Sequence, residues 1–177
     1  MKFSAQLLVA FLSTGALAGV APRALSDFQA AMTDVQTKTD ALDTAINAFT
    51  GGSTTPVQTA ANNLVSTLNS RNAILSPLPV LSLADTFTLN NQVTSFKTHA
   101  QTLVNDLIAK RPVVISSSNC ALVRSNIVTI RGAATPFINT LVAHADPAAT
   151  SIAQAQANAI QAILQQGQDA YNTTNCP

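Results

Sequence analysis

The chain has 177 residues, of which 47% are hydrophobic and only 10% are charged, whereas an average globular domain has about 25% charged residues. This length suits one domain with a hydrophobic core of its own. The formal net charge of +1 gives no field that would hold a phosphate backbone or an anionic membrane, so nucleic-acid binding is not expected.

The inventory of reactive side chains is poor. All eight acidic residues are aspartate, glutamate and tryptophan are absent, and there are two histidines, His99 and His144. Helical di-metal proteins use glutamates and Glu-x-x-His pairs, which this chain lacks. It also has no nucleophile elbow, phosphate-binding glycine loop or dinucleotide fingerprint. We therefore expect no enzymatic activity, no cofactor and no metal site.

Two polar arrangements have a simpler interpretation than catalysis. His99 and Asp106 are seven residues apart on one face of a predicted helix, but no nucleophile or oxyanion hole accompanies them as a catalytic triad would require. Asp40 and Asp43 are three residues apart on another predicted helix. We interpret His99 as a solvated side chain and the two aspartates as part of a solvent-exposed helix face.

The first 18 residues are organised like a secretory signal peptide. Lys2 gives a positive start, the apolar run LLVAFL follows, and residues 16–18 (Ala-Leu-Ala) form a cleavage site. This run is too short to span a bilayer, and no other apolar run reaches about 18 residues, so no transmembrane segment is expected. The sequence predicts a signal peptide over 1–18 and a single secreted domain over 19–177, without an apolar tail for a lipid anchor.

Apolar residues recur at helical spacing through the rest of the chain. The first predicted helix covers 28–49, with Ser26 as its N-cap and Gly51-Gly52 as its end. The second has Thr55 as its N-cap and Pro56 in its first turn, and it stops at residues 76–77.

The third predicted helix begins at Ser82 and is closed by Pro112, so residues 113–119 (VVISSSN) are expected to form a loop. The fourth has the most regular pattern and covers 120–145. Its interior Pro136 is expected to kink the helix near Gly132 or divide it there.

The fifth predicted helix is capped by Asp146-Pro147 and frays into the C-terminal NTTNC. Its inward positions are expected to be Ile152, Ala159, Ile163 and Leu164. Long amphipathic helices joined by short connections predict neighbours that run antiparallel. The expected fold class is therefore all-α, an up-and-down bundle of about five amphipathic helices.

The two cysteines fit this layout. Cys120 opens the fourth helix and Cys176 follows the fifth, so both sulfurs reach the same end if these helices pack antiparallel. A disulfide between them would contribute about 4 kcal/mol in the chain-entropy model, although free thiols or an intermolecular bridge remain alternatives. The single N-glycosylation sequon begins at Asn172.

The outward positions are mostly Ser, Thr, Asn and Gln, so the predicted helices are amphipathic but almost uncharged. Such helices could enclose an apolar ligand or lie on an apolar surface, and a solid core would give the same pattern. The candidate ligand contacts, equally good as core residues, are the larger apolar residues of the stripes: Leu42, Ile46, Leu64, Leu68, Phe96, Leu103, Leu107, Ile127, Ile130, Phe137, Leu141 and Ile163.

Several local features occur together: the signal peptide, a first helix ending in Gly51-Gly52, the pair Lys110-Arg111, a Ser-rich loop leading into CALVR (120–124), and Asp-Ala-Tyr before Asn172. In these features the sequence resembles the fungal hydrophobic surface binding protein A family, which includes cell-wall galactomannoproteins. The resemblance implies a secreted, non-enzymatic helical domain that adsorbs to hydrophobic surfaces and, as in the galactomannoproteins, sequesters fatty acids between its helices. Since no Ser/Thr-rich stalk or anchor signal is seen, release or non-covalent association with the cell wall is expected.

A second hypothesis comes from a different class of protein. Secreted helical inhibitors of carbohydrate-active enzymes have a similar size, although they usually carry more than the two cysteines found here. The chain could accordingly be a protein-interaction module that inhibits or recruits a secreted hydrolase. Uptake of fatty acid or depletion onto hydrophobic beads would favour the first hypothesis, and capture of an enzyme without lipid uptake would favour the second.

Overall fold

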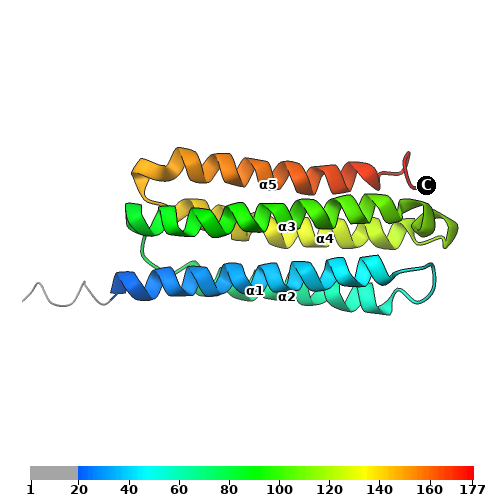
Figure 1. Cartoon of the computed structure of the whole chain (residues 1–177), viewed down its shortest axis with the longest axis horizontal. Helices are drawn as coiled ribbons and strands as arrows, with labels where there is room; N and C mark the ends of the chain where they lie inside the picture. Colours follow the sequence, from blue (N-terminus) through cyan, green and yellow to red (C-terminus); the bar gives the residue numbers. More distant parts are fainter. Residues whose placement is uncertain (1–19) are drawn as a thin grey trace, which may run out of the picture.

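The computed structural model describes residues 20–177. Five long helices lie side by side with their axes roughly parallel (Figure 1). Residues 20–177 contain no strand. The predicted all-α bundle of five helices is therefore confirmed. The predicted signal peptide lies outside the described residues. The helices are α1 (Val20–Ala48), α2 (Thr55–Leu75), α3 (Leu83–Ser116), α4 (Cys120–Ala143) and α5 (Thr150–Ala170), with a 3₁₀ turn η1 (Pro147–Ala149) before α5.

The helices form a closed ring in the order α1–α2–α4–α5–α3. Each helix packs against its two neighbours in this ring, and α3 and α4 also make a small contact. Consecutive helices run in opposite directions, as predicted, but α2 and α3, both within the described residues, do not pack against each other. Among the pairs in contact, α1–α3, α2–α4 and α3–α5 are parallel, whereas α1–α2, α4–α5 and α3–α4 are antiparallel.

Hydrogen bonds between helices show these directions. Thr140 of α4 donates to Asn72 of α2 over 2.7 Å, which joins the C-terminal parts of both helices. Lys97 of α3 donates to Gln156 of α5 over 3.1 Å. The segment 76–82 crosses the end of the bundle to reach α3 (Figure 1), and there the Leu81 N–H donates to the His144 carbonyl.

A five-membered ring of helices leaves more room at its centre than a four-helix bundle. With axes about 9 Å apart, five helices lie about 8 Å from the centre of the ring, against about 6 Å for four. Only the larger side chains reach the axis from that distance. Wherever a small residue faces inward, some space at the centre remains unfilled.

Helix ends differ from the predicted ones at several points. Ser26 lies inside α1 and is not its cap, and the N-cap of α2 is Thr54, one residue before the predicted Thr55. α1 ends at Ala48, one residue before the predicted end. In the turn that follows, Gly51 has a φ of +98°, a backbone conformation that residues with a Cβ rarely adopt. Ser82 caps α3 as predicted, since its hydroxyl accepts from the Asp85 N–H.

The prediction that Pro112 closes the third helix is wrong. α3 continues through Pro112 to Ser116, so only the end of the predicted loop is non-helical. The pyrrolidine ring is exposed, whereas Val114 is buried against Phe49 and Tyr171. The free energy gained by burying Val114 offsets the loss of the backbone hydrogen bond that the proline removes.

α4 and α5 need two similar corrections. α4 is one continuous helix through Gly132 and Pro136, so the predicted division is wrong, while the alternative of a kink stays a prediction. Asp146 caps η1 by accepting from the Ala148 N–H over 2.8 Å, and α5 begins only at Thr150. Ile152, predicted to face inward, is 40% exposed; the buried positions of α5 are Ala157, Ile160, Ile163 and Gly167.

The C-terminal end of α5 is firmly attached to α3 and α4. The predicted disulfide is confirmed between Cys120 and Cys176, whose Cα atoms are 5.4 Å apart. The Tyr171 hydroxyl donates to the Leu107 carbonyl over 2.7 Å, and burial raises the pKa of this phenol to about 12. Arg124 donates to the carbonyls of Tyr171 and Cys176.

Candidate functional site

The centre of the ring contains a cavity of about 50 Å³. This volume has room for a few water molecules at about 10–15 Å³ each. All five helices contribute to its wall, which is apolar at every position except Thr39. The lining residues are Met32, Val35, Thr39, Leu64, Leu68, Phe96, Ala100, Leu103, Val104, Ile130, Ala134, Phe137, Ile138, Leu141, Ile160 and Leu164.

The one polar residue in this wall makes its hydrogen bond elsewhere. Thr39 is buried, and its hydroxyl donates to the Val35 carbonyl of the same helix over 2.9 Å. The central cavity therefore presents hydrocarbon to whatever occupies it and has no charged group with which to bind a polar molecule. Such a wall suits an aliphatic chain, because burial of apolar surface is the main favourable interaction available.

Most of the candidate contacts from the sequence line this central cavity: Leu64, Leu68, Phe96, Leu103, Ile130, Phe137 and Leu141. Ile46 and Leu107 line a separate cavity of about 30 Å³ toward the disulfide end. Leu42, Ile127 and Ile163 line none of these spaces and pack in the core.

The candidate contacts predicted from the sequence did not include the small residues that line the central cavity. Ala100 and Ala134 occupy inward positions of α3 and α4, and both are buried beside the cavity. An alanine within a stripe of Leu, Ile and Phe was the available signal, since it leaves volume that a larger residue would fill.

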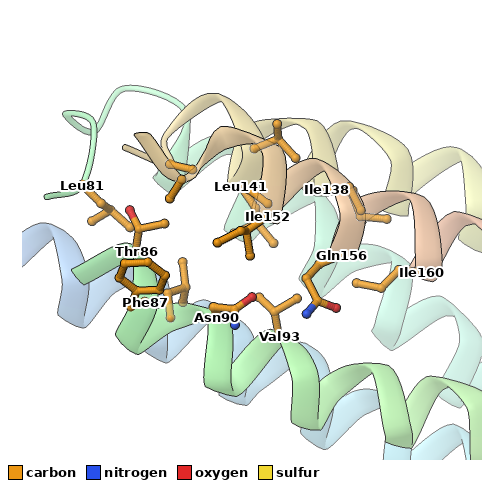
Figure 2. Close-up of a pocket in the computed structure, with 16 residues that line it drawn as sticks. Leu81, Thr86, Phe87, Asn90, Val93, Ile138, Leu141, Ile152, Gln156 and Ile160 are labelled. Carbon is orange, nitrogen blue, oxygen red and sulfur yellow. The ribbon is translucent and has the colours of Figure 1, made fainter. Parts of the chain in front are cut away.

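A second cavity of about 40 Å³ opens between α3, α4, η1 and α5 (Figure 2); we call it the end cavity. Its wall shares Ile138, Leu141 and Ile160 with the central cavity, so the two spaces are adjacent. At its rim Phe87 and Ile152 are exposed. The end cavity thus places an apolar opening beside the central cavity.

Exposed large apolar side chains concentrate at this same end of the bundle, which we call the η1 end. They lie in the last turn of α2, in the connection to α3, in the first turns of α3 and at the start of α5: Ile74, Val80, Leu83, Phe87 and Ile152. Two others, Ile115 and Val128, lie elsewhere. Several exposed apolar residues in one region are typical of an interaction surface.

The polar residues noted in the sequence form contacts between α1 and α3. His99 Nδ1 lies 2.7 Å from Asp40 Oδ1, and Asp106 accepts from Asn47 over 2.7 Å. His99 and Asp106 therefore each bond to a residue of α1 and not to each other. His99 is half-buried and bonded rather than simply solvated, because α1 packs alongside α3 at this level.

Asp43 is also not simply on a solvent-exposed face. Its Oδ1 is buried and has no hydrogen-bond partner within the described part of the chain. Burial, followed by repulsion from the charge of Asp106, raises the pKa of the Asp43 carboxyl from its usual 3.8. A raised pKa in the folded state means that the native protein binds a proton more readily than the unfolded chain does.

Asp43→Asn is therefore expected to raise the free energy of unfolding at pH 7, where the wild-type carboxylate is charged. As the pH falls through the raised native pKa toward 3.8, the wild-type group becomes protonated and the advantage of the variant should disappear. Thermal unfolding of both proteins between pH 7 and pH 3 measures this. A variant that is less stable at pH 7, or whose advantage grows with acidity, would contradict the assignment.

The described residues contain no group of His, Cys and Asp side chains arranged to hold a metal ion. Among the same residues, no helix has the length and apolar character needed to cross a membrane. The features that stand out are the central cavity, the end cavity and the exposed apolar residues at the η1 end.

Solved fungal ligand-binding domains have the same fold. The structure superposes with a TM-score of 0.81 on ligand-binding domain 1 of the Penicillium marneffei MP1 protein complexed with arachidonic acids, at 18% identity, covering 85% of this chain and 99% of that one. It superposes with a TM-score of 0.73 on AFMP4P in complex with palmitic acid, at 22% identity, covering 86% and 99%.

The sequence comparison gives the family. The model of the hydrophobic surface binding protein A family matches residues 25–143, and the chain belongs to this family. It is 31% identical to cell wall mannoprotein 1 of Aspergillus fumigatus over 97% of the chain and 26% identical to that of Aspergillus flavus over 97%. The chain spans 60% and 63% of the lengths of these relatives.

Proposed function

We propose that the protein is a secreted, non-catalytic lipid-binding domain that holds the hydrocarbon chain of a fatty acid along the centre of its helical ring. The observation that carries this proposal is the central cavity, with an apolar wall built by all five helices. Support comes from the solved relatives, which have the same fold and contain arachidonic or palmitic acid.

The unliganded cavity is smaller than a long acyl chain. Its volume of about 50 Å³ admits a few waters at about 10–15 Å³ each, so the helices must separate to admit a fatty acid. Since tightly packed interiors resist such opening, we infer that the adjoining end cavity supplies part of the space. A chain extending from the end cavity into the central cavity would pass Ile138, Leu141 and Ile160, which line both.

The test of this proposal is a cavity-filling variant. Ala134→Leu adds three carbon atoms at a buried position in the cavity wall and should weaken palmitate binding, measured by isothermal titration calorimetry, by about tenfold or more. Gly132→Ala is the matched control on the same helix, because a Cβ there meets nothing within 4 Å. Wild-type affinity in a folded Ala134→Leu protein would exclude the central cavity as the site.

Adsorption to hydrophobic surfaces is a second candidate function, favoured by the apolar residues at the η1 end. Leu83 and Phe87 are exposed in the first turns of α3 and could contact an apolar surface without unfolding. We expect Leu83→Ser/Phe87→Ser to leave more protein in solution over polystyrene beads, whereas Val128→Ser, equally exposed on α4, should behave as wild type. Equal depletion of all three proteins would argue against adsorption through this end.

The remaining roles proposed from the sequence concern location and partners. The names of the Aspergillus relatives support a secreted protein associated with the cell wall, and non-covalent attachment stays a prediction. Inhibition or recruitment of a secreted hydrolase stays a prediction, as does glycosylation of Asn172, whose side chain is exposed.

A further inference from the structure

A lysine without a carboxylate partner lies on the seam between α3 and α5. Lys97 is half-buried, and its Nζ donates to Gln156 Oε1 over 3.1 Å. Gln156 Nε2 in turn donates to Thr94 Oγ1 over 3.3 Å. Residues 86–105 of α3 and 150–168 of α5 contain no acidic residue, so a neutral amide is the acceptor of this ammonium group.

This pair lies where the two cavities meet. Gln156 lines the end cavity and extends from α5 beside Val93 of α3 (Figure 2). Ile160, one turn further along α5, lines both cavities, and Phe96, next to Lys97 in the chain, lines the central cavity.

Other polar groups near this position are already engaged. His99 of α3 faces α1, where it contacts Asp40. Arg131 of α4 donates to Gln165 and Gln168, further along α5. On the α3–α5 seam, Arg111 donates to the Ala170 carbonyl at the end of α5, whereas Lys97 donates to a neutral side chain that lines the end cavity.

We propose that Lys97 and Gln156 form the binding site for the carboxylate of the bound fatty acid, with the acyl chain directed into the central cavity. This inference rests on the proposed function. The carboxylate would replace the Gln156 amide oxygen at Lys97 Nζ, because a charge-assisted hydrogen bond is stronger than one to a neutral amide. Gln156 Nε2 would donate to the second carboxylate oxygen and give up its bond to Thr94.

The attachment of α5 favours opening at this place. Its C-terminal end is fixed by the disulfide and by Tyr171 and Arg124, whereas its first half faces the end cavity with the small residues Ala153 and Ala157. Outward movement of this half would widen the seam beside Lys97. The carboxylate would then remain near solvent, which avoids the cost of burying a charge in the apolar centre.

The test compares palmitate with hexadecan-1-ol, which has the same chain length but no charge. Lys97→Met keeps most of the side-chain volume and should weaken palmitate binding by about tenfold or more while leaving hexadecanol binding unchanged. Wild type should bind palmitate more tightly than hexadecanol, and Lys97→Arg, which keeps the positive charge, should retain this preference. Lys38→Met, on α1 beside an outer groove with α2, is the control and should bind both ligands as wild type does.

The possible failures are distinguishable. If Lys97→Met binds palmitate as tightly as wild type, the carboxylate site is wrong while the hydrocarbon site stands. An equal loss of both ligands would also overturn the site, since it would show that Lys97 acts through the structure of the seam. If wild type binds neither ligand, the proposed function itself fails.

Discussion

Phe137→Asp is expected to unfold the bundle. Phe137 is 2% exposed and packs both in the main core and against the central cavity. Loss of a buried phenylalanine alone costs about 3–5 kcal/mol, and an unpaired carboxylate in its place adds several kcal/mol more. Together these losses are comparable to the free energy of unfolding of a typical domain, about 5–15 kcal/mol. Far-ultraviolet circular dichroism at 25 °C should show loss of the helical signal.

The matched control for this variant is Phe87→Asp. Phe87 is 47% exposed at the η1 end, so a charged side chain there remains in water, and the helical signal and urea midpoint should stay close to the wild-type values. If Phe137→Asp instead unfolded cooperatively near the wild-type midpoint, the centre of the ring would not be the core of the protein.

Removal of the disulfide is expected to produce the second large effect. Cys120 and Cys176 are 56 residues apart in the chain, and closing a loop of this length contributes about 4 kcal/mol in the chain-entropy model. Both cysteines are buried in a cluster with Phe49, Val114 and Tyr171, so the double variant Cys120→Ala/Cys176→Ala also loses some packing. Urea unfolding of oxidised wild type and of the variant measures the difference.

Reduction of the wild type provides the control for this experiment. Under a reducing agent the wild type should fall to a stability close to that of the double variant, whereas the variant should not respond. A difference between oxidised wild type and variant smaller than about 1 kcal/mol would show that the bridge does little to restrict the unfolded chain.

The helices could be predicted from the sequence because their apolar stripes are long and regular. The local rules failed where tertiary packing outweighed them. Pro112 normally ends a helix, but burial of Val114 against Phe49 carries α3 past it. Ile152 has a plausible inward spacing, yet η1 delays the start of α5 and leaves this residue at the rim of the end cavity.

The order of the helices around the ring could not be predicted from the periodicity of the apolar residues. A stripe indicates which face of a helix is buried and leaves its partner undefined, so the contact of α1 with α3, including the pairing of Asp40 with His99, could not be foreseen. The same holds for the cavity. Leu68 and Leu42 have equivalent sequence patterns, but only Leu68 lines the central cavity.

The most direct measurement is native mass spectrometry of the protein purified from the culture of its own source organism, with any glycan on Asn172 accounted for. The account predicts a species heavier than the polypeptide by the mass of a fatty acid, which delipidation removes and added palmitate restores. A bare polypeptide mass before and after incubation with palmitate would contradict it.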